Sequence, residues 1–287
     1  MKNILLIGND GQVGFELQRA LGALGQVTAV CYPAIDFSTP DSIIRVVREA
    51  RPHLIVNAAA YTAVDKAETE TELCRTLNAA APAILAEEAK RLGAGLIHYS
   101  TDFVFDGARQ QPYTETDQPH PLNVYGATKL EGDLAIRDSG VPHLIFRLAW
   151  VYGLRGKNFL LTMRRLASEG KSLRVVSDQI GCPTWCRTIA DATATALMKV
   201  RADDGTLDLA QVSGLYHCVC AGQTSWQGFA RAFMPADIPV IPITTADYPT
   251  PAKRPFYSVL NCDKFAKTFG KPLPPWETAL SDCLSSG

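Results

Sequence analysis

The chain lacks the features that mark a membrane protein, a nucleic-acid-binding protein or a secreted protein. No run of about 18 apolar residues occurs, so the sequence predicts no membrane span. The formal net charge is -1, which leaves no basic footprint for nucleic acid. The N-terminal residues enter a strand-like run without an apolar leader and cleavage site, so we expect no signal peptide. These absences predict a cytoplasmic protein that acts on a small molecule.

Metal and disulfide signals are also missing, although the chain has 8 cysteines. None of the cysteines forms a CxxC pair, and no histidine lies at metal-ligand spacing from a pair of them. Several lie within apolar runs, as Cys218 and Cys220 do. Reduced, buried thiols therefore fit better than disulfides or zinc, and we expect no metal site. No internal repeat or low-complexity segment is visible.

What the chain has instead is a regular alternation of short apolar runs and amphipathic runs. Its 287 residues, 47% of them hydrophobic, are enough for a large core. The pattern predicts a Rossmann-type, doubly wound parallel sheet with helices on both faces. We expect strands at Asn3–Ile7, Val27–Cys31, Leu54–Asn57, Leu96–Ser100, Leu144–Leu148 and Leu215–Val219. We expect helices at Gly14–Leu24, Ser42–Ala50, Ala79–Leu92, Val124–Asp138, Leu160–Ser168 and Thr188–Lys199.

The composition changes after Tyr152. A basic, glycine-containing loop at Gly153–Phe159 comes first, and proline-rich segments follow further on. Loops of this kind often carry ligand contacts. We expect a dinucleotide-binding domain formed by residues 1–150 and 186–221. Residues 151–185 and 222–287 would then form a smaller C-terminal substrate-binding lobe.

A glycine-rich turn follows the first predicted strand and opens a helix, as in dinucleotide-binding proteins. Gly8 permits the tight turn, Gly11 lets the backbone approach a pyrophosphate, and Gly14 lets the helix pack closely. Gln12 and Val13, at the helix start, would present backbone N–H groups to phosphate. The pattern predicts a nucleotide cofactor at this turn.

A tyrosine and a lysine four residues apart, Tyr125 and Lys129, lie on one face of a predicted helix. A cationic lysine beside a phenol lowers the pKa of that phenol, which makes tyrosine a usable acid or base. Thr101 ends a predicted strand, where open parallel sheets bind ligands, and Asp102 follows it. We expect Thr101 to hold a substrate carbonyl oxygen that Tyr125 protonates, with Lys129 on the nicotinamide ribose. Hydride transfer from a nicotinamide is the reaction that needs this set.

With these motifs in place, the chain resembles the extended short-chain dehydrogenase/reductase superfamily, and within it the dTDP-4-dehydrorhamnose reductase family. The similar segments run from residue 8 to 255 and so cover nearly the whole chain. The tyrosine–lysine pair is shared by the superfamily, whereas the HYSTD, AWVYG and TPAKRP segments discriminate within it. The resemblance implies reduction of the C4 keto group of dTDP-4-dehydro-L-rhamnose, the last step of dTDP-L-rhamnose synthesis.

The resemblance also implies roles for individual residues. Tyr125 would be the proton donor, Lys129 and Tyr125 would contact the cofactor, and Thr101 and Asp102 would contact the hexulose. Trp150 would lie against the substrate sugar, and we expect Arg254, a bidentate donor, to reach the nucleotide diphosphate. The remaining residues expected to line the cofactor are Gly11, Gln12, Val13, Asp36, Phe37, Ala59, Ala60, Tyr61 and Thr62.

The chain departs from the family pattern at two places. Cys31 stands where an acidic residue often binds the adenine ribose, so we expect NADPH to be used, with NADH as the other possibility. Some members are described as magnesium-bridged dimers that use an acidic residue equivalent to Glu16 and another after the Pro-Thr motif. That second region reads Trp185-Cys186-Arg187 here, and an arginine opposes a cation. We therefore expect no magnesium and favour a monomer over a homodimer.

Two other functions fit parts of the pattern. A sugar-nucleotide dehydratase or epimerase of the same superfamily is one, but dehydratases generally place Asp-Glu after the active-site threonine, whereas Phe103 follows Asp102 here. A non-catalytic protein resembling the regulatory β subunit of methionine adenosyltransferase is the other. The complete set of Thr101, Tyr125 and Lys129 favours the enzyme.

Overall fold

A computed structural model describes residues 3–203 and 205–287. Its centre is a six-stranded parallel sheet in the order β10-β5-β4-β3-β1-β2. The order changes direction between β1 and β3, which is the point where doubly wound sheets bind nucleotides. The strands are β1 (Asn3–Ile7), β2 (Gln26–Val30), β3 (Leu54–Asn57), β4 (Gly95–Thr101), β5 (His143–Leu148) and β10 (Gly214–His217). The predicted fold class is confirmed.

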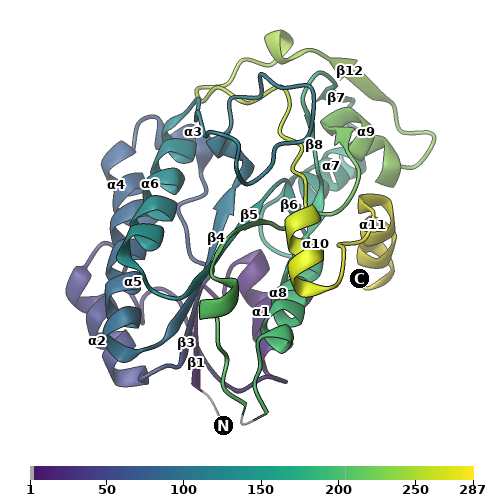
Figure 1. The fold of residues 1–287 in the computed structure, drawn as a ribbon. Helices are drawn as coiled ribbons and strands as arrows, with labels where there is room; N and C mark the ends of the chain where they lie inside the picture. Colours follow the sequence, from purple (N-terminus) through teal and green to yellow (C-terminus); the bar gives the residue numbers. More distant parts are fainter. Residues whose placement is uncertain (1–2, 204) are drawn as a thin grey trace.

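Helices cover both faces of this sheet (Figure 1). On one face lie α2 (Pro40–Ala50), α5 (Ala81–Leu92) and α6 (Val124–Ser139), with α3 (Val64–Ala67) and α4 (Thr71–Arg75) beside them. On the other face lie α1 (Gln12–Leu21) and α8 (Cys186–Lys199). A π-helical turn, Thr76–Ala80, joins α4 to α5. The expected helices are all present, with ends that shift by a few residues.

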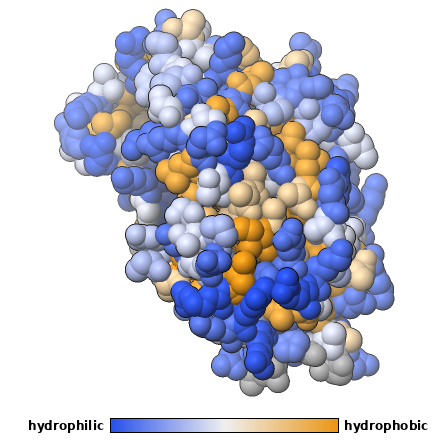
Figure 2. Space-filling model, turned by 90° about the vertical axis from the view of Figure 1, so that its left-hand side faces the viewer, coloured by the Kyte–Doolittle hydropathy of each residue, from blue (hydrophilic) through white to orange (hydrophobic). Residues whose placement is uncertain are grey.

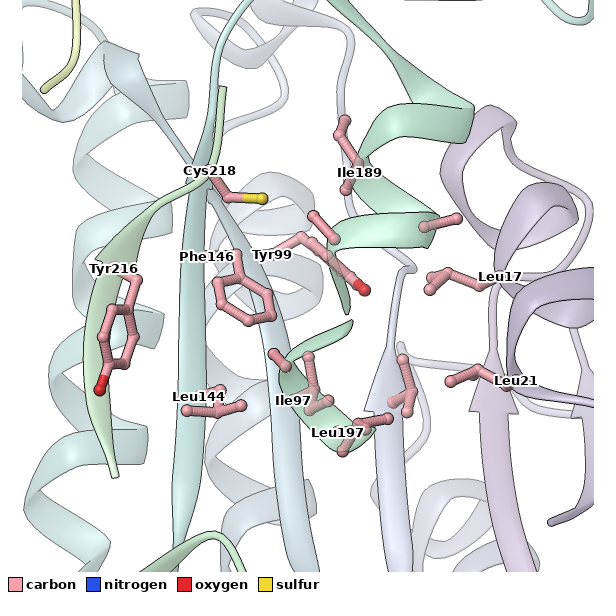
Figure 3. Packing of buried hydrophobic residues seen from close by; sticks show 14 of the residues in the cluster. Leu17, Leu21, Ile97, Tyr99, Leu144, Phe146, Ile189, Leu197, Tyr216 and Cys218 are labelled. Atoms are coloured by element: carbon pink, nitrogen blue, oxygen red, sulfur yellow. The ribbon is translucent and has the colours of Figure 1, made fainter. Parts of the chain in front are cut away.

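The strands are buried on both sides, which explains their nearly continuous apolar sequences. Figure 3 shows one face of the core, where Leu17 and Leu21 of α1 and Ile189 of α8 approach the sheet. On that sheet surface lie Ile97 and Phe146. A second apolar cluster fills the opposite face beneath α2, α5 and α6. This double burial holds the carboxyl ends of the strands in register.

The remaining elements lie beside the carboxyl end of the sheet (Figure 1). They are held by three two-stranded pairings, β6 with β9, β7 with β12, and β8 with β11. The helices here are α7 (Phe159–Ser168), α9 (Trp226–Phe233), α10 (Asp263–Phe269) and α11 (Trp276–Ser285). The short strands are β6 (Val151–Tyr152), β7 (Leu173–Val176), β8 (Ile180–Gly181), β9 (Thr184–Trp185), β11 (Thr224–Ser225) and β12 (Val240–Ile243). These short parallel and antiparallel pairs had no clear periodicity in the sequence.

One side of the molecule has a mostly hydrophilic surface. Figure 2 shows the side that carries α4, α5 and α6, where blue side chains surround hydrophobic ones gathered towards the middle. Half-exposed leucines on these helices include Leu73, Leu92 and Leu134. None of the described helices is both long and apolar enough to cross a membrane. All eight cysteines are free thiols, six of them buried.

Candidate active site

A cavity of about 910 Å³ opens at the carboxyl ends of the central strands and contains most of the predicted site residues. Its volume falls in the range of natural cofactor and ligand pockets. The glycine turn and Trp150 both line this cavity. The predicted residues on its wall are Gly8, Gly11, Gln12, Val13, Asp36, Phe37, Ala59, Ala60, Thr62, Thr101, Asp102, Tyr125, Lys129 and Trp150. Gly14, Tyr61 and Arg254 lie outside this wall.

The glycine turn is built for close approach. Gly8 has φ +85°, and a Cβ added to it would lie 2.7 Å from the backbone nitrogen of Ala59. A Cβ on Gly14 would lie 2.0 Å from the carbonyl oxygen of Gly8, so α1 rests directly on the turn. The helix begins at Gln12 without a side-chain cap and without an acidic residue in its first turn. Its free N–H groups therefore face the cavity and suit a cofactor diphosphate.

The segment that follows β2 also lines the cavity. Cys31, Tyr32, Asp36, Phe37 and Ser38 line the cavity there. The Asp36 carboxylate accepts hydrogen bonds from the Ser38 hydroxyl at 2.6 Å and the Ser38 backbone N–H at 2.8 Å, which lower its pKa. These bonds turn Asp36 towards its own loop. No carboxylate stands at position 31 to exclude a ribose phosphate.

Thr101 and Tyr125 lie close together because the backbone that follows β4 is in close contact with the start of α6. Thr101 is the last residue of β4, and the next residues form a short 3₁₀ turn, η2 (Asp102–Val104). A Cβ on Gly126 would lie 2.2 Å from the carbonyl oxygen of Phe103, so the start of α6 sits directly on this turn. Asn123 caps α6 by accepting from the Gly126 N–H at 2.8 Å. This packing places the Thr101 hydroxyl beside Tyr125.

The charge state of Tyr125 differs from the one expected from its spacing to Lys129. Burial raises the pKa of Tyr125, and the neighbouring Thr101 hydroxyl offsets only part of that rise. The expected lowering by lysine is therefore wrong for this structure, because the Lys129 ammonium points elsewhere. A raised pKa keeps the phenol protonated at neutral pH, which is the state that a proton donor needs.

Lys129 is 1% exposed and lies at the cavity wall. Its Nζ donates to the carbonyl oxygen of Tyr99 at 2.6 Å and lies 2.9 Å from Nε2 of His98. Burial lowers the pKa of Lys129 to about 8 and lowers that of His98 as well. The other ring nitrogen of His98 lies 3.1 Å from the amide of Asn57. A neutral imidazole has one donor and one acceptor nitrogen. The hydrogen-bonded series Asn57–His98–Lys129 therefore couples the protonation state of Lys129 to the tautomer of His98.

Sequence reasoning missed these supporting residues. Asn57 and His98 are fully buried polar side chains inside otherwise apolar strands, and that contrast was the available signal. Asn78, in the π-helical turn, was also missed. Its side chain accepts from the backbone N–H of Tyr61 at 2.9 Å and donates to the Tyr61 carbonyl at 3.1 Å. It thereby holds the loop that contains Ala60 and Thr62 against the cavity.

Asp102 is 2% exposed at the cavity wall. Burial raises the pKa of its carboxyl to about 6, and the neighbouring hydroxyl groups of Ser258 and Thr101 offset only part of that rise. The Thr101 hydroxyl lies 3.2 Å from Oδ1. The carboxyl therefore changes charge close to neutral pH, next to Tyr125.

Trp150 adopts the left-handed backbone region, with φ 44°. Such a conformation is rare for a bulky residue and occurs mainly where surrounding structure enforces it. The indole stacks on that of Trp226, with ring centroids 3.6 Å apart and planes 5° from parallel. A Cβ on Gly181 would lie 2.4 Å from the same indole. Trp226 and Gly181, which sequence reasoning did not select, therefore hold Trp150 at the cavity.

Arg254 is occupied by a different partner from the one expected. Its guanidinium donates to both carboxylate oxygens of Asp65, at 2.9 and 2.8 Å, and also to Thr250 at 2.7 Å. The neighbouring Lys253 carbonyl accepts from the Asn123 side chain at 2.7 Å. These bonds tie residues 253 and 254 to α3 and to the cap of the helix that carries Tyr125. The proposed diphosphate contact of Arg254 stays a prediction.

Glu16, which the resemblance to the family places at a metal site, forms ion pairs within the chain. The Arg187 guanidinium donates to Glu16 Oε2 at 3.0 Å, and Arg19 lies 3.5 Å from the same oxygen. Two cations thus surround a carboxylate that is 7% exposed. Among residues 3–203 and 205–287, no three His, Cys, Asp or Glu side chains cluster as metal ligands.

Comparison with known proteins agrees with this geometry. A family model described as "RmlD substrate binding domain" matches residues 1–287. The dTDP-4-dehydrorhamnose reductase of Burkholderia thailandensis is 46% identical, over 98% of this chain and 97% of that protein. The enzyme of the same name from Escherichia coli is 45% identical, over 99% and 97%.

A solved structure extends the likeness to three dimensions. The dTDP-4-dehydrorhamnose reductase of Bacillus anthracis, determined in complex with NADP, superposes with a TM-score of 0.91. It is 32% identical and the match covers 100% of this chain and 99% of that one. Both the sequence and the fold are therefore shared over essentially the full length, and the chain belongs to the dTDP-4-dehydrorhamnose reductase family.

Proposed function

We propose that this chain reduces the C4 keto group of dTDP-4-dehydro-L-rhamnose to give dTDP-L-rhamnose, with NADPH as the hydride source. The observation that carries the proposal is the joining of Thr101 and Tyr125 in one cavity with the glycine turn. The relatives that carry this reductase name support the choice of substrate.

The residues present fit a dinucleotide. The bare N-terminus of α1 faces the cavity, and Gly8 and Gly14 let the turn pack tightly against the Ala59 backbone and against α1, which fixes that N-terminus in place. Bound there, the nucleotide supplies the hydride. Thr101 donates a hydrogen bond to the carbonyl oxygen, and Tyr125 transfers its proton to that oxygen as negative charge develops. Lys129 holds the nicotinamide ribose, and the raised pKa of Tyr125 keeps the proton in place until it is needed.

Asp102 and Trp150 hold the sugar in this proposal. Trp150 presents an aromatic face to the apolar side of a deoxysugar, and its stack on Trp226 keeps that face in position. Arg254 reaches the diphosphate of the substrate only by leaving Asp65, so its role includes an exchange of partners. Gly14 and Tyr61 act on the cofactor indirectly, through the turn and through the loop that Asn78 holds.

The reductase is favoured over an epimerase or a dehydratase by the position after Asp102. Phe103 stands there, with its ring edge-on to Tyr125 at a centroid distance of 5.7 Å. Elimination needs an acid and a base on the substrate, whereas reduction needs one hydride and one proton. A regulatory subunit without activity would not require Thr101 and Tyr125 to lie together, so their proximity favours the enzyme.

The proposal includes a metal-independent enzyme that is largely monomeric and cytoplasmic. Arg187 and Arg19 already neutralise Glu16, so a divalent cation would have to displace an ion pair. Buried free thiols suit a reducing compartment. Light scattering and the rate assay, each with and without EDTA, test the first two points. A dimer that dissociates on chelation with loss of activity would contradict both.

The proposed division into domains follows the packing. α8 lies against α1 and β10 joins the main sheet, which supports assigning residues 186–221 to the nucleotide domain. The strand pairs and helices of residues 151–185 and 222–287 support a separate substrate lobe.

The direct test is cofactor oxidation at 340 nm with purified protein and dTDP-4-dehydro-L-rhamnose. We expect turnover with NADPH and slower or equal turnover with NADH. Absence of turnover with either nucleotide, from protein that binds them, would reject the reductase.

A further inference from the structure

The loop that follows Trp150 and β6 packs against the glycine turn, although the two are more than 140 residues apart. The side-chain amide of Asn158 donates to Gln12 Oε1 at 2.7 Å and to the Gly153 carbonyl at 2.9 Å. Gly156 has φ +71°, and a Cβ added to it would lie 3.4 Å from Cγ of Gln12. The loop therefore runs directly over the first residue of α1.

Two basic side chains project from this loop. The guanidinium of Arg155 stacks on the ring of Phe15, with 3.7 Å between its central carbon and the ring centroid. Lys157 is exposed and lines the same cavity as Gly11 and Gln12. Within the described part of the chain, Lys157 has neither an ion-pair nor a hydrogen-bond partner. Arg155 thus holds the loop against α1, whereas Lys157 lines the cavity.

A positively charged side chain at the glycine turn would favour the binding of a diphosphate there. A helix N-terminus contributes roughly half a positive charge. Asp10 lines the cavity at the same turn and brings a full negative charge. A diphosphate carries two negative charges, so the turn alone would repel it more than it attracts it. Lys157 is placed to reverse that balance.

We infer that the Gly153–Lys157 loop clasps the cofactor and that Lys157 binds its diphosphate opposite the N-terminus of α1. The inference rests on the proposed use of a nicotinamide dinucleotide. It concerns the part that NADPH and NADH share, so Lys157 strengthens the binding of both nucleotides equally. The Gly153–Lys157 loop follows Trp150 in the chain. Binding of the cofactor to this loop would therefore also affect the position of Trp150, the residue proposed to hold the sugar.

The test is equilibrium titration of the protein with NADPH and with NADH, followed by nucleotide fluorescence without sugar substrate. We expect Lys157→Ala to weaken both nucleotides by about tenfold, as loss of a charged hydrogen bond does, and to leave their affinity ratio unchanged. Lys157→Arg should restore most of the affinity. The matched control is Lys199→Ala, at an exposed lysine at the end of α8 away from the cavity, which should bind as wild type does.

Affinities within twofold of wild type for both nucleotides would overturn the inference. A loss confined to NADPH would also overturn it, because Lys157 would then contact the ribose phosphate. The experiment is independent of turnover. Tight, Lys157-dependent binding without reduction of the sugar would contradict the proposed reaction and leave the clasp standing.

Discussion

Replacement of Asp102 by asparagine should stabilise the protein at neutral pH while it impairs the reaction. Asp102→Asn keeps the shape of the side chain and removes its charge. The carboxyl is 2% exposed, and its pKa rises from the ordinary 3.8 to about 6 on folding. Each unit of such a rise corresponds to about 1.4 kcal/mol, so the charged carboxylate costs the fold about 3 kcal/mol at pH 7.

The pH dependence follows from the sign of this rise. Below about pH 4 the carboxyl is protonated in both the folded and the unfolded chain, so it does not change the free energy of unfolding. Between about pH 4 and pH 6 the folded protein still binds the proton and the unfolded chain has lost it. Stability therefore falls as pH rises through this window, and the penalty stays constant above it. Asp102→Asn should remove this fall.

The assay is urea denaturation of both proteins at pH 4 and at pH 7. We expect nearly equal free energies of unfolding at pH 4 and an advantage of about 3 kcal/mol for the variant at pH 7. Asp237→Asn, at an exposed aspartate, is the control for loss of a carboxylate and should follow wild type at both pH values. Equal stability of wild type and Asp102→Asn at pH 7 would show that burial does not govern this carboxyl. Full activity in the variant would remove Asp102 from the site.

Four further variants test the reaction, the cofactor choice and the sugar contact. Tyr125→Phe should keep nucleotide binding and lose about 10²–10⁴-fold in turnover, and turnover within threefold of wild type would exclude Tyr125 as proton donor. Cys31→Asp should shift preference towards NADH in competition kinetics by repelling the 2′-phosphate, an argument that fails if the wild type already uses only NADH. Trp150→Phe should lower kcat/KM for the sugar with little change in melting temperature, whereas a large fall in melting temperature with normal kinetics would assign Trp150 to the core. Gly181→Ala should have a similar kinetic effect, because its Cβ would displace the Trp150 indole.

The sequence by itself determined the fold class and predicted most of the residues that line the cavity. Strands buried on both faces must be apolar, and their alternation with amphipathic runs leaves few topologies. β1 and β3 agree with the predicted runs residue for residue. A glycine turn between a strand and a helix carries its own geometry, because φ +85° at Gly8 is a local requirement. Local chemistry of this kind can be read without knowing what lies nearby.

Only the tertiary structure decided how the side chains are charged and paired. The spacing of Tyr125 and Lys129 predicted a lowered phenol pKa, but burial raises it, and the lysine bonds to His98 and Tyr99 instead. Arg254 meets Asp65, which lies 189 residues away in the chain. Burial and long-range pairing depend on which elements pack together, and a single sequence contains no local signal for that. The helix and turn motifs were predictable because their causes lie within a few residues, whereas pKa values and ion pairs depend on distant ones.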